Sequence, residues 1–344
     1  MGPILERVSV LRPVPYDEGV RITVLAGGFG GSRFIAGVRD AMAPDDELSV
    51  IANTADDIWL FGLRVSPDLD TIMYTMGGGI DPERGWGRTD ETWHAKEELA
   101  AYGEPQAWFG LGDRDLATHL VRTSHLRVGR TLTEATAELC RRWGIGVTLL
   151  PMTDTEVETH IATTVDGHDD VIHFQEYWIR HGAAVPVRGV ELHGIDQALP
   201  TPEVLSAISQ ADAVLVAPSN PIVSIGPIVA VPGMTEALGA ARSPVVGVSP
   251  IIGGAAVRGM ADQLLDGLGI EGTAAGVAHH LGARPEGGLL DGWLVDTEDA
   301  GEMERIQAAG ITARSVPLYM RDVPTTRQLA ADALALASEL GARS

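Results

Sequence analysis

Residues 22–33 read Ile-Thr-Val-Leu-Ala-Gly-Gly-Phe-Gly-Gly-Ser-Arg, an apolar run that leads directly into a glycine-rich turn. The pattern predicts a buried strand, a tight turn and then a helix. Backbone N–H groups at the start of a helix bind anions, and glycine lets a phosphate approach the backbone closely. Gly27, Gly28, Gly30 and Gly31 therefore form a candidate phosphate site, although the same glycines would also let the strand and the helix pack closely.

The spacing of this turn argues against two familiar nucleotide-binding motifs. A Walker phosphate loop requires a lysine after its glycines, and the only lysine of the chain is Lys96. The dinucleotide-binding fingerprint requires a third glycine where Arg33 stands, which counts against a nicotinamide-dependent dehydrogenase. The turn is thus interpreted as a phosphate cradle of another kind.

Short apolar runs alternate with helical patterns over most of the chain, which is typical of a parallel sheet covered by helices on both faces. We therefore expect an α/β, Rossmann-like fold in a single domain, residues 21–344, with a helical insertion at about 71–145 and residues 1–20 as an irregular extension. A β-hairpin is expected at 157–175. Strands are expected at 21–26, 47–52, 146–151, 212–217, 244–249 and 289–295. Helices are expected at 31–43, 89–102, 114–124, 131–143, 202–210, 257–269, 299–308 and 325–340.

Composition limits the classes of partner and compartment. The formal charge of −22 argues against nonspecific binding to nucleic acid or to an anionic membrane. The single cysteine, Cys140, excludes a disulfide framework, and no apolar run reaches the roughly 18 residues of a membrane span. The sequence therefore predicts a cytoplasmic protein whose positive charge for any phosphate ligand comes from arginines, helix N-termini or a divalent metal.

Four aspartates follow the second expected strand within a short stretch: Asp56, Asp57, Asp68 and Asp70. Because ligands of open α/β sheets bind at the carboxyl ends of the strands, we expect these carboxylates to face the ligand together with Asn53 and Thr54. Carboxylate oxygens suit Mg²⁺. The alternative for a single residue is helix capping, with Asp70 at the start of a helix over residues 71–75.

Three further loops supply candidate ligand contacts. In the loop Phe109 to Asp115, Gly110 permits close approach and Arg114 offers a planar fork for phosphate, or else pairs with a neighbouring aspartate. After two later strands, neutral donors and acceptors could contact a nucleotide, or merely form tight turns. These are Ser219, Asn220, Ser224 and Ser249.

Seven motifs occur in order along the chain. They are Gly-Gly-x-Gly-Gly (27–31), Asn-Thr-Ala-Asp-Asp (53–57), Ser-Pro-Asp-Leu-Asp-Thr (66–71), Leu-Gly-Asp-Arg-Asp-x-Ala-Thr-His (111–119), His-Phe-Gln-Glu-Tyr-Trp (173–178), Pro-Ser-Asn-Pro-Ile-Val-Ser-Ile-Gly-Pro (218–227) and Val-Ser-Pro-Ile-Ile-Gly-Gly (248–254). Together they resemble the 2-phospho-L-lactate transferases of coenzyme F420 biosynthesis, and the similarity runs from about residue 21 to the C-terminus. The segments at 77–87 and 90–99 resemble the actinobacterial phosphoenolpyruvate transferase branch most closely.

The resemblance implies a Mg²⁺-dependent phosphotransferase that acts as a homodimer. The acceptor would be the deazaflavin Fo, and the donor a guanosine diphosphate ester of lactate or, in the actinobacterial branch, of enolpyruvate. The terminal ribityl hydroxyl of Fo would attack the distal phosphorus, so that GMP leaves and F420-0 or its dehydro form results.

The resemblance also implies roles for single residues. Asp70 would lie near the metal and Fo, and Asp57 and Asp56 would be further metal ligands, with Asp57 also a candidate base. Residues 109–115 would border the deazaflavin, while the glycine turn, Ser219 and Asn220 would hold the donor. The alternative function is a non-catalytic regulator that binds nucleotide sugars and shares the glycine turn and the aspartate segment.

Overall fold

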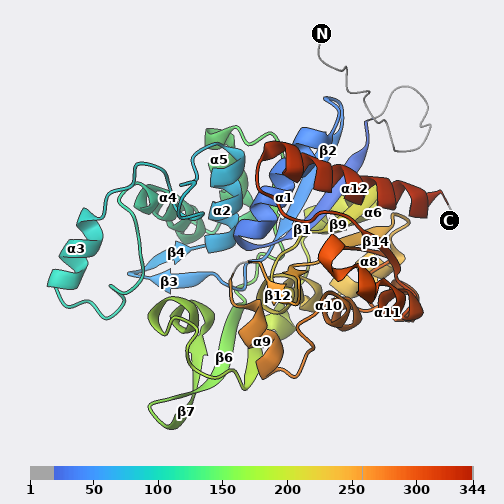
Figure 1. Cartoon of the computed structure of the whole chain (residues 1–344). Coiled ribbons are helices and arrows are strands. Elements are labelled where there is room, and N and C mark those ends of the chain that lie inside the picture. Colours follow the sequence, from blue (N-terminus) through green and yellow to red (C-terminus); the bar gives the residue numbers. More distant parts are fainter. Residues whose placement is uncertain (1–18, 258, 343–344) are drawn as a thin grey trace.

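The computed structural model describes residues 19–257 and 259–342, so the expected extension at 1–20 falls almost entirely outside the described residues. A seven-stranded parallel sheet forms the centre of the molecule, in the order β14-β13-β10-β9-β1-β2-β5 (Figure 1). Its strands are β1 (Arg21–Ala26), β2 (Glu47–Ala52), β5 (Thr148–Pro151), β9 (Ala213–Val216), β10 (Val245–Val248), β13 (Gly292–Val295) and β14 (Thr312–Ser315). The expected α/β fold class is confirmed.

Helices cover both faces of this sheet, whereas α3 (His94–Ala101) lies apart from it (Figure 1). The other helices of the described residues are α1 (Gly28–Ala41), α2 (Pro67–Met76), α4 (Asp115–Arg127), α5 (Leu132–Trp143), α6 (Pro202–Ser209), α7 (Gly226–Ala230), α8 (Met234–Ala240), α9 (Ala261–Gly267), α10 (Ala274–Leu281), α11 (Met303–Ala308) and α12 (Val323–Gly341). Short helical turns are η1 (Glu176–Arg180), η2 (Ile195–Gln197), η3 (Pro221–Ile225), η4 (Arg284–Glu286) and η5 (Thr297–Glu302).

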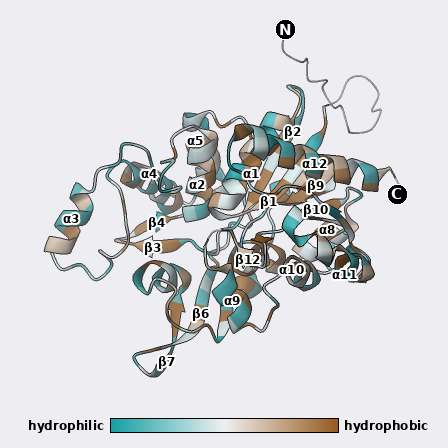
Figure 2. Cartoon of the chain, in the orientation of Figure 1, coloured by the Kyte–Doolittle hydropathy of each residue, from teal (hydrophilic) through white to brown (hydrophobic). Residues whose placement is uncertain are grey.

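The core divides into two layers because neighbouring residues of a strand point to opposite faces. Val24 of β1 packs with apolar residues of α1, α2, α5 and α12, whereas the adjacent Leu25 packs with those of α6, α8, α9 and α10. Both side chains are fully buried. Hydropathy varies around α1 and α12, as expected for helices that separate a sheet from solvent (Figure 2).

Local signals set several helix ends. A capping box of Thr131 and Glu134 starts α5, and Gly144, with a φ of 57°, ends it. The helix after the glycine turn begins at Gly28 rather than at residue 31, so the glycines form its first turn. The helix expected at 89–102 is shorter, because α3 begins only at His94.

Three smaller sheets accompany the main one. The hairpin expected at 157–175 is confirmed as β6 (Glu158–Val165) and β7 (His168–His173), and β8 (Gly189–His193) adds a third strand on the other side of β6. β3 (Ile58–Leu60) pairs with β4 (Leu63–Val65), and β11 (Ile251–Ile252) pairs with β12 (Ala255–Ala256).

Within the described residues no single helix is long and apolar enough to span a membrane, and one bent pair of helices reaches that length and composition only when taken together. That pair joins residues Pro221–Ala230 to Met234–Ala240 at an angle of 82°.

Candidate active site

The order of the central strands reverses at β1. The chain moves from β1 to β2 and β5 on one side and later returns through β9 to the other side. Such a reversal is where open α/β sheets bind their ligands. The glycine turn follows β1 and the Pro218-Ser219-Asn220 loop follows β9, so the two loops face each other at this point.

The glycine turn is tied to the loop after β9. The Gly27 N–H donates to Ser219 Oγ at 3.1 Å, and the same hydroxyl donates to the Gly27 carbonyl at 2.8 Å. A Cβ on Gly30 would lie 2.9 Å from the Pro218 carbonyl oxygen, and one on Gly31 would lie 2.6 Å from Ser219 Oγ. The glycines are therefore required by the close approach of these two loops, and the Ser219 hydroxyl holds the turn in shape.

A buried carboxylate lies against the same turn. A Cβ on Gly27 would collide with the Asp68 carboxylate, which also accepts a hydrogen bond from Asn53 Nδ2 at 3.0 Å. Burial raises the pKa of Asp68 to about 6. Burial also raises the pKa of Asp56 well above its ordinary value, and the neighbouring Asp68 adds to that shift. Two carboxylates thus meet beside a turn that would otherwise attract anions.

Asp57 belongs to a second group of charges. Its Oδ2 accepts a hydrogen bond from the Ser66 hydroxyl at 2.6 Å and lies 3.5 Å from Arg64 Nε. Burial nevertheless raises the pKa of Asp57 to about 7, because the Arg64 charge and the Ser66 hydrogen bond only partly offset desolvation. Asp57 is completely buried.

Asp70 is bound by an arginine that the sequence analysis did not single out. Arg122 of α4 contacts both Asp70 oxygens, with its Nη1 3.1 Å from Oδ2. His119 lies between Asp70, at 3.6 Å, and Asp115, at 3.3 Å. The Tyr74 hydroxyl donates to Asp115 at 2.5 Å. Burial would lower the pKa of Arg122, but the adjacent Asp70 outweighs this effect and raises it.

The alternative of Asp70 as a helix cap is wrong. Ser66 stands at the N-cap of α2, and Pro67 occupies the first helical position, so Asp70 lies inside the first turn. Its carboxylate is free of a capping role and is directed to Arg122.

The small three-stranded sheet supports the aspartate loop from outside the main sheet. His173, at the end of β7, places Nε2 3.3 Å from the Asp57 carbonyl oxygen, and Gln175 Nε2 donates to the Asp56 carbonyl at 3.4 Å. Burial lowers the pKa of His173 to about 4, which favours the neutral imidazole at this position.

The loop expected to border a flat ring lies in an aromatic neighbourhood. A Cβ on Gly110 would lie 3.3 Å from the ring of Trp86 and 3.6 Å from that of Trp93. The segment carrying Trp86 also reaches the glycine turn, because a Cβ on Gly85 would lie 2.7 Å from the ring of Phe29. The aromatic group therefore extends from Gly110 to the start of α1.

The remaining candidates make local contacts. Arg114 is about half exposed, and its Nη1 lies 3.9 Å from the carboxylate of Asp90, which belongs to an earlier segment than the flanking aspartates considered in the alternative. Asn220 accepts from the Ile222 and Val223 N–H groups and so starts η3. The Ser249 hydroxyl bonds within its own turn, to Ile251. Ser224 lies beside the glycine turn, 2.8 Å from a Cβ built on Gly27.

Buried oxygen atoms without hydrogen-bond partners indicate whether a divalent metal fits the candidate site. Among the described residues, Oδ1 of Asp56, Oδ1 of Asp57 and the Thr54 hydroxyl are buried and form no hydrogen bond. Such groups are costly to bury unless something binds them. Asp70, Asp115 and His119 also lie close enough to hold an ion, although Arg122 already neutralises Asp70. The oxygen-rich set fits a hard cation such as Mg²⁺.

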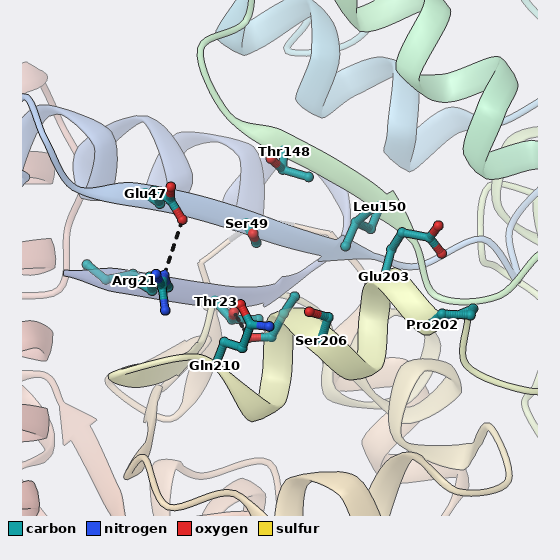
Figure 3. Close-up of a pocket in the computed structure, with 12 residues that line it drawn as sticks. Arg21, Thr23, Glu47, Ser49, Thr148, Leu150, Pro202, Glu203, Ser206 and Gln210 are labelled. Atoms are coloured by element: carbon teal, nitrogen blue, oxygen red, sulfur yellow. Dashed lines mark hydrogen bonds and ion pairs between the residues drawn. The ribbon is translucent and has the colours of Figure 1, made fainter. Parts of the chain in front are cut away.

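A groove of about 400 Å³ opens at the opposite end of the sheet (Figure 3). Arg21, Glu47 and Thr148 begin their strands there, and an ion pair joins the first two at 3.4 Å. The lining residues include no buried polar side-chain atom that lacks a partner. The carboxyl end of the sheet therefore remains the candidate site.

Comparison with known proteins identifies the family. Residues 22–329 match the family described as 2-phospho-L-lactate transferase CofD. The phosphoenolpyruvate transferase of Streptomyces coelicolor is 58% identical over 93% of this chain and 99% of its own length. That of Nocardia farcinica is 55% identical over 93% and 95%, and that of Mycobacterium avium is 50% identical over 92% and 99%.

The solved structure of protein BH3568 from Bacillus halodurans shares the fold, with a TM-score of 0.63 and 15% identity over 92% of this chain and 100% of that one. The expected resemblance, including its actinobacterial branch, is confirmed. The chain is a transferase enzyme and belongs to the CofD family of 2-phospho-L-lactate transferases.

Proposed function

We propose that this enzyme transfers a phosphoenolpyruvyl group, or a 2-phospho-L-lactyl group, from a guanosine diphosphate ester to the terminal ribityl hydroxyl of the deazaflavin Fo. The new bond joins the hydroxyl oxygen to the distal phosphorus, the diphosphate bridge breaks, and GMP leaves. The hydroxyl proton passes to a nearby base or to water. The product is dehydro-F420-0 or F420-0, and the acting form is a homodimer in the cytoplasm.

The observation that carries this proposal is the set of four buried carboxylates at the reversal point of the sheet. Phosphoryl transfer depends on positioning and on neutralising charge rather than on a covalent intermediate. Three oxygens of Asp56, Asp57 and Thr54 are buried without partners. A diphosphate at the glycine turn would also face Asp68, so charge balance there favours a cation between them.

We propose the following roles for single residues. Mg²⁺ would be held by Asp57, Asp56 and Asp70, and it would neutralise charge on the transferring phosphoryl group. Asp70 would orient the attacking hydroxyl. The backbone of Gly27, Gly28, Gly30 and Gly31 would hold the donor phosphates. Asn53, Thr54, Ser219, Asn220, Ser224 and Ser249 would complete the donor site, and Phe109, Gly110 and Arg114 would border Fo.

The test combines the purified enzyme with Fo, Mg²⁺ and each of the two donors, followed by mass spectrometry of the product. GMP and the dehydro product are expected with the enolpyruvyl donor. Asp70→Asn should lower kcat by at least about 100-fold. Asp45→Asn, at an exposed position, is the matched control. Absence of GMP with either donor would contradict the proposed function, and an active Asp70→Asn enzyme would remove Asp70 from the mechanism.

A further inference from the structure

Helix α4 buries polar residues and exposes apolar ones. Its buried residues are Thr118, His119, Arg122 and Thr123. By contrast, the side chains of Leu120 and Val121 are 56% and 41% exposed. A helix ordinarily stabilises a fold by turning its apolar stripe inward, but in α4 only Leu116 and Leu126 pack, partly buried, against the core, so hydrophobic burial explains only part of its orientation.

The contacts of Arg122 help to explain the orientation of α4. Besides its two contacts to the Asp70 carboxylate, Nη1 lies 3.3 Å from His119 Nδ1 and 3.4 Å from the Arg64 carbonyl oxygen. The residue is only 1% exposed. Burying an arginine is costly, and a buried ion pair seldom stabilises a fold more than well-packed apolar residues would. What the pair does provide is a fixed direction for one carboxylate.

We propose that Arg122 is a positioning residue for Asp70, with His119 and Asp115 as its support; this inference rests on the proposed function. A bidentate guanidinium fixes the plane of a carboxylate as well as its place. Each carboxylate oxygen has two lone-pair directions, so the two contacts with Arg122 leave a direction on each oxygen for the hydroxyl or a cation. His119 packs beside the same Asp70 oxygen, with its Nδ1 3.6 Å from Oδ2 and its Nε2 3.3 Å from Asp115, and so limits the space into which Asp70 and Arg122 could move.

Arg122→Lys separates geometry from charge, because lysine keeps the positive charge but lacks the planar fork. We expect kcat to fall on the order of 100-fold, the scale of a misplacement of about 1 Å in a catalytic group. The KM values for Fo and for the donor should stay within about twofold, because the reacting geometry and not substrate binding has changed. Arg127→Lys, on the exposed last turn of α4, is the control and should retain full activity.

A double variant shows whether Arg122 acts through Asp70. In Asp70→Asn the carboxylate is gone, so adding Arg122→Lys should reduce kcat by no more than about twofold further. A fall in kcat of the double variant that equals the product of the falls in the two single variants would overturn the proposal. So would an Arg122→Lys enzyme with kcat within about threefold of the unaltered enzyme, or one whose loss of activity is fully explained by a smaller folded fraction in circular dichroism.

Metal binding gives a readout that does not need turnover. Calorimetric titration with Mg²⁺ alone should show at least about fivefold weaker binding in Arg122→Lys than in Arg127→Lys, since Asp70 would be misdirected at unchanged charge. Equal affinities would overturn the positioning role. If the unaltered enzyme released no GMP with either donor, the proposed function would fail, and this titration would still decide the role of Arg122.

Discussion

Gly31→Ala is expected to destabilise the protein, although alanine is the better helix former. Gly31 lies in the first turn of α1, where a Cβ would stand 2.6 Å from Ser219 Oγ and 3.1 Å from the Ala26 Cβ. Ser219 cannot move away without breaking its two hydrogen bonds to Gly27, at 3.1 and 2.8 Å. The substitution therefore sets helix propensity against the contact between two loops.

The costs of the steric contact exceed the gain in helix propensity. Alanine gains about 1 kcal/mol over glycine inside a helix. Overpacking costs about 1 to 3 kcal/mol, and leaving the buried Gly27 N–H without a partner costs about 1 to 3 kcal/mol. We expect a net loss of about 2 kcal/mol. Gly239→Ala is the matched control, because this glycine of α8 has open space around its Cβ position and should gain up to about 1 kcal/mol.

Urea unfolding followed by circular dichroism measures the unfolding free energy of each variant. In the double variant Gly31→Ala with Ser219→Ala the hydroxyl is gone. Its loss of unfolding free energy should therefore be about 1 kcal/mol smaller than the sum of the losses in the two single variants. Strict additivity, or a Gly31→Ala protein as stabilised as the Gly239→Ala protein, would refute the reasoning that Ser219 is what requires a glycine here.

Other contacts give further expected outcomes. Burial raises the pKa of Asp57 to about 7 and of Asp68 to about 6, so between about pH 4 and 7 these two carboxyl groups bind more protons in the folded state than in the unfolded chain, whereas His173, with its pKa lowered to about 4, binds fewer. In EDTA, the contribution of the two aspartates to thermal stability should therefore fall as the pH rises through this window, and Asp68→Asn should remove its share of that fall; a pH slope equal to that of the unaltered enzyme would contradict the burial argument. Asp113→Ala removes a carboxylate that accepts from the N–H groups at the start of α3, a helix with no buried residue, so hydrogen exchange should accelerate in α3 while global stability stays nearly constant. Asn53→Ala removes the buried amide that bonds Asp68 and two backbone groups, and calorimetry should show a loss of about 2 to 4 kcal/mol; a smaller loss would mean that water replaces the amide.

The central strands could be predicted because they are buried on both faces. β9 appears in the sequence as an unbroken apolar run and β1 as an apolar run interrupted by Thr23, and the structure confirms both strands. β14 was not predicted, because Thr312–Ser315 is an edge strand of half-buried residues without an apolar run. η3 and α7 were missed because Pro221 and Pro227 suggest turns, yet proline is well tolerated in the first turn of a helix.

The candidate site was predictable only in part. Parallel strands end at one edge, so the loops carrying Asn53, Asp57 and Ser219 could be brought together from topology alone. Arg122 could not be assigned, since it lies 52 residues from Asp70 and only tertiary packing brings them together. The available signal was its spacing of three residues from His119, which puts both on one helix face. The roles assigned to individual residues in binding and catalysis remain predictions.

The aspartate loop and the glycine turn are held by contacts between residues far apart in the chain, and this has a consequence for how the enzyme folds. His173 and Gln175 contact the aspartate loop across 116 and 119 residues, and Ser219 contacts Gly27 across 192 residues. Contacts that close such long loops form late, because the entropy of closure must first be offset by other interactions. During refolding, helix content should therefore return before activity does, and the site should be the last part of the molecule to form.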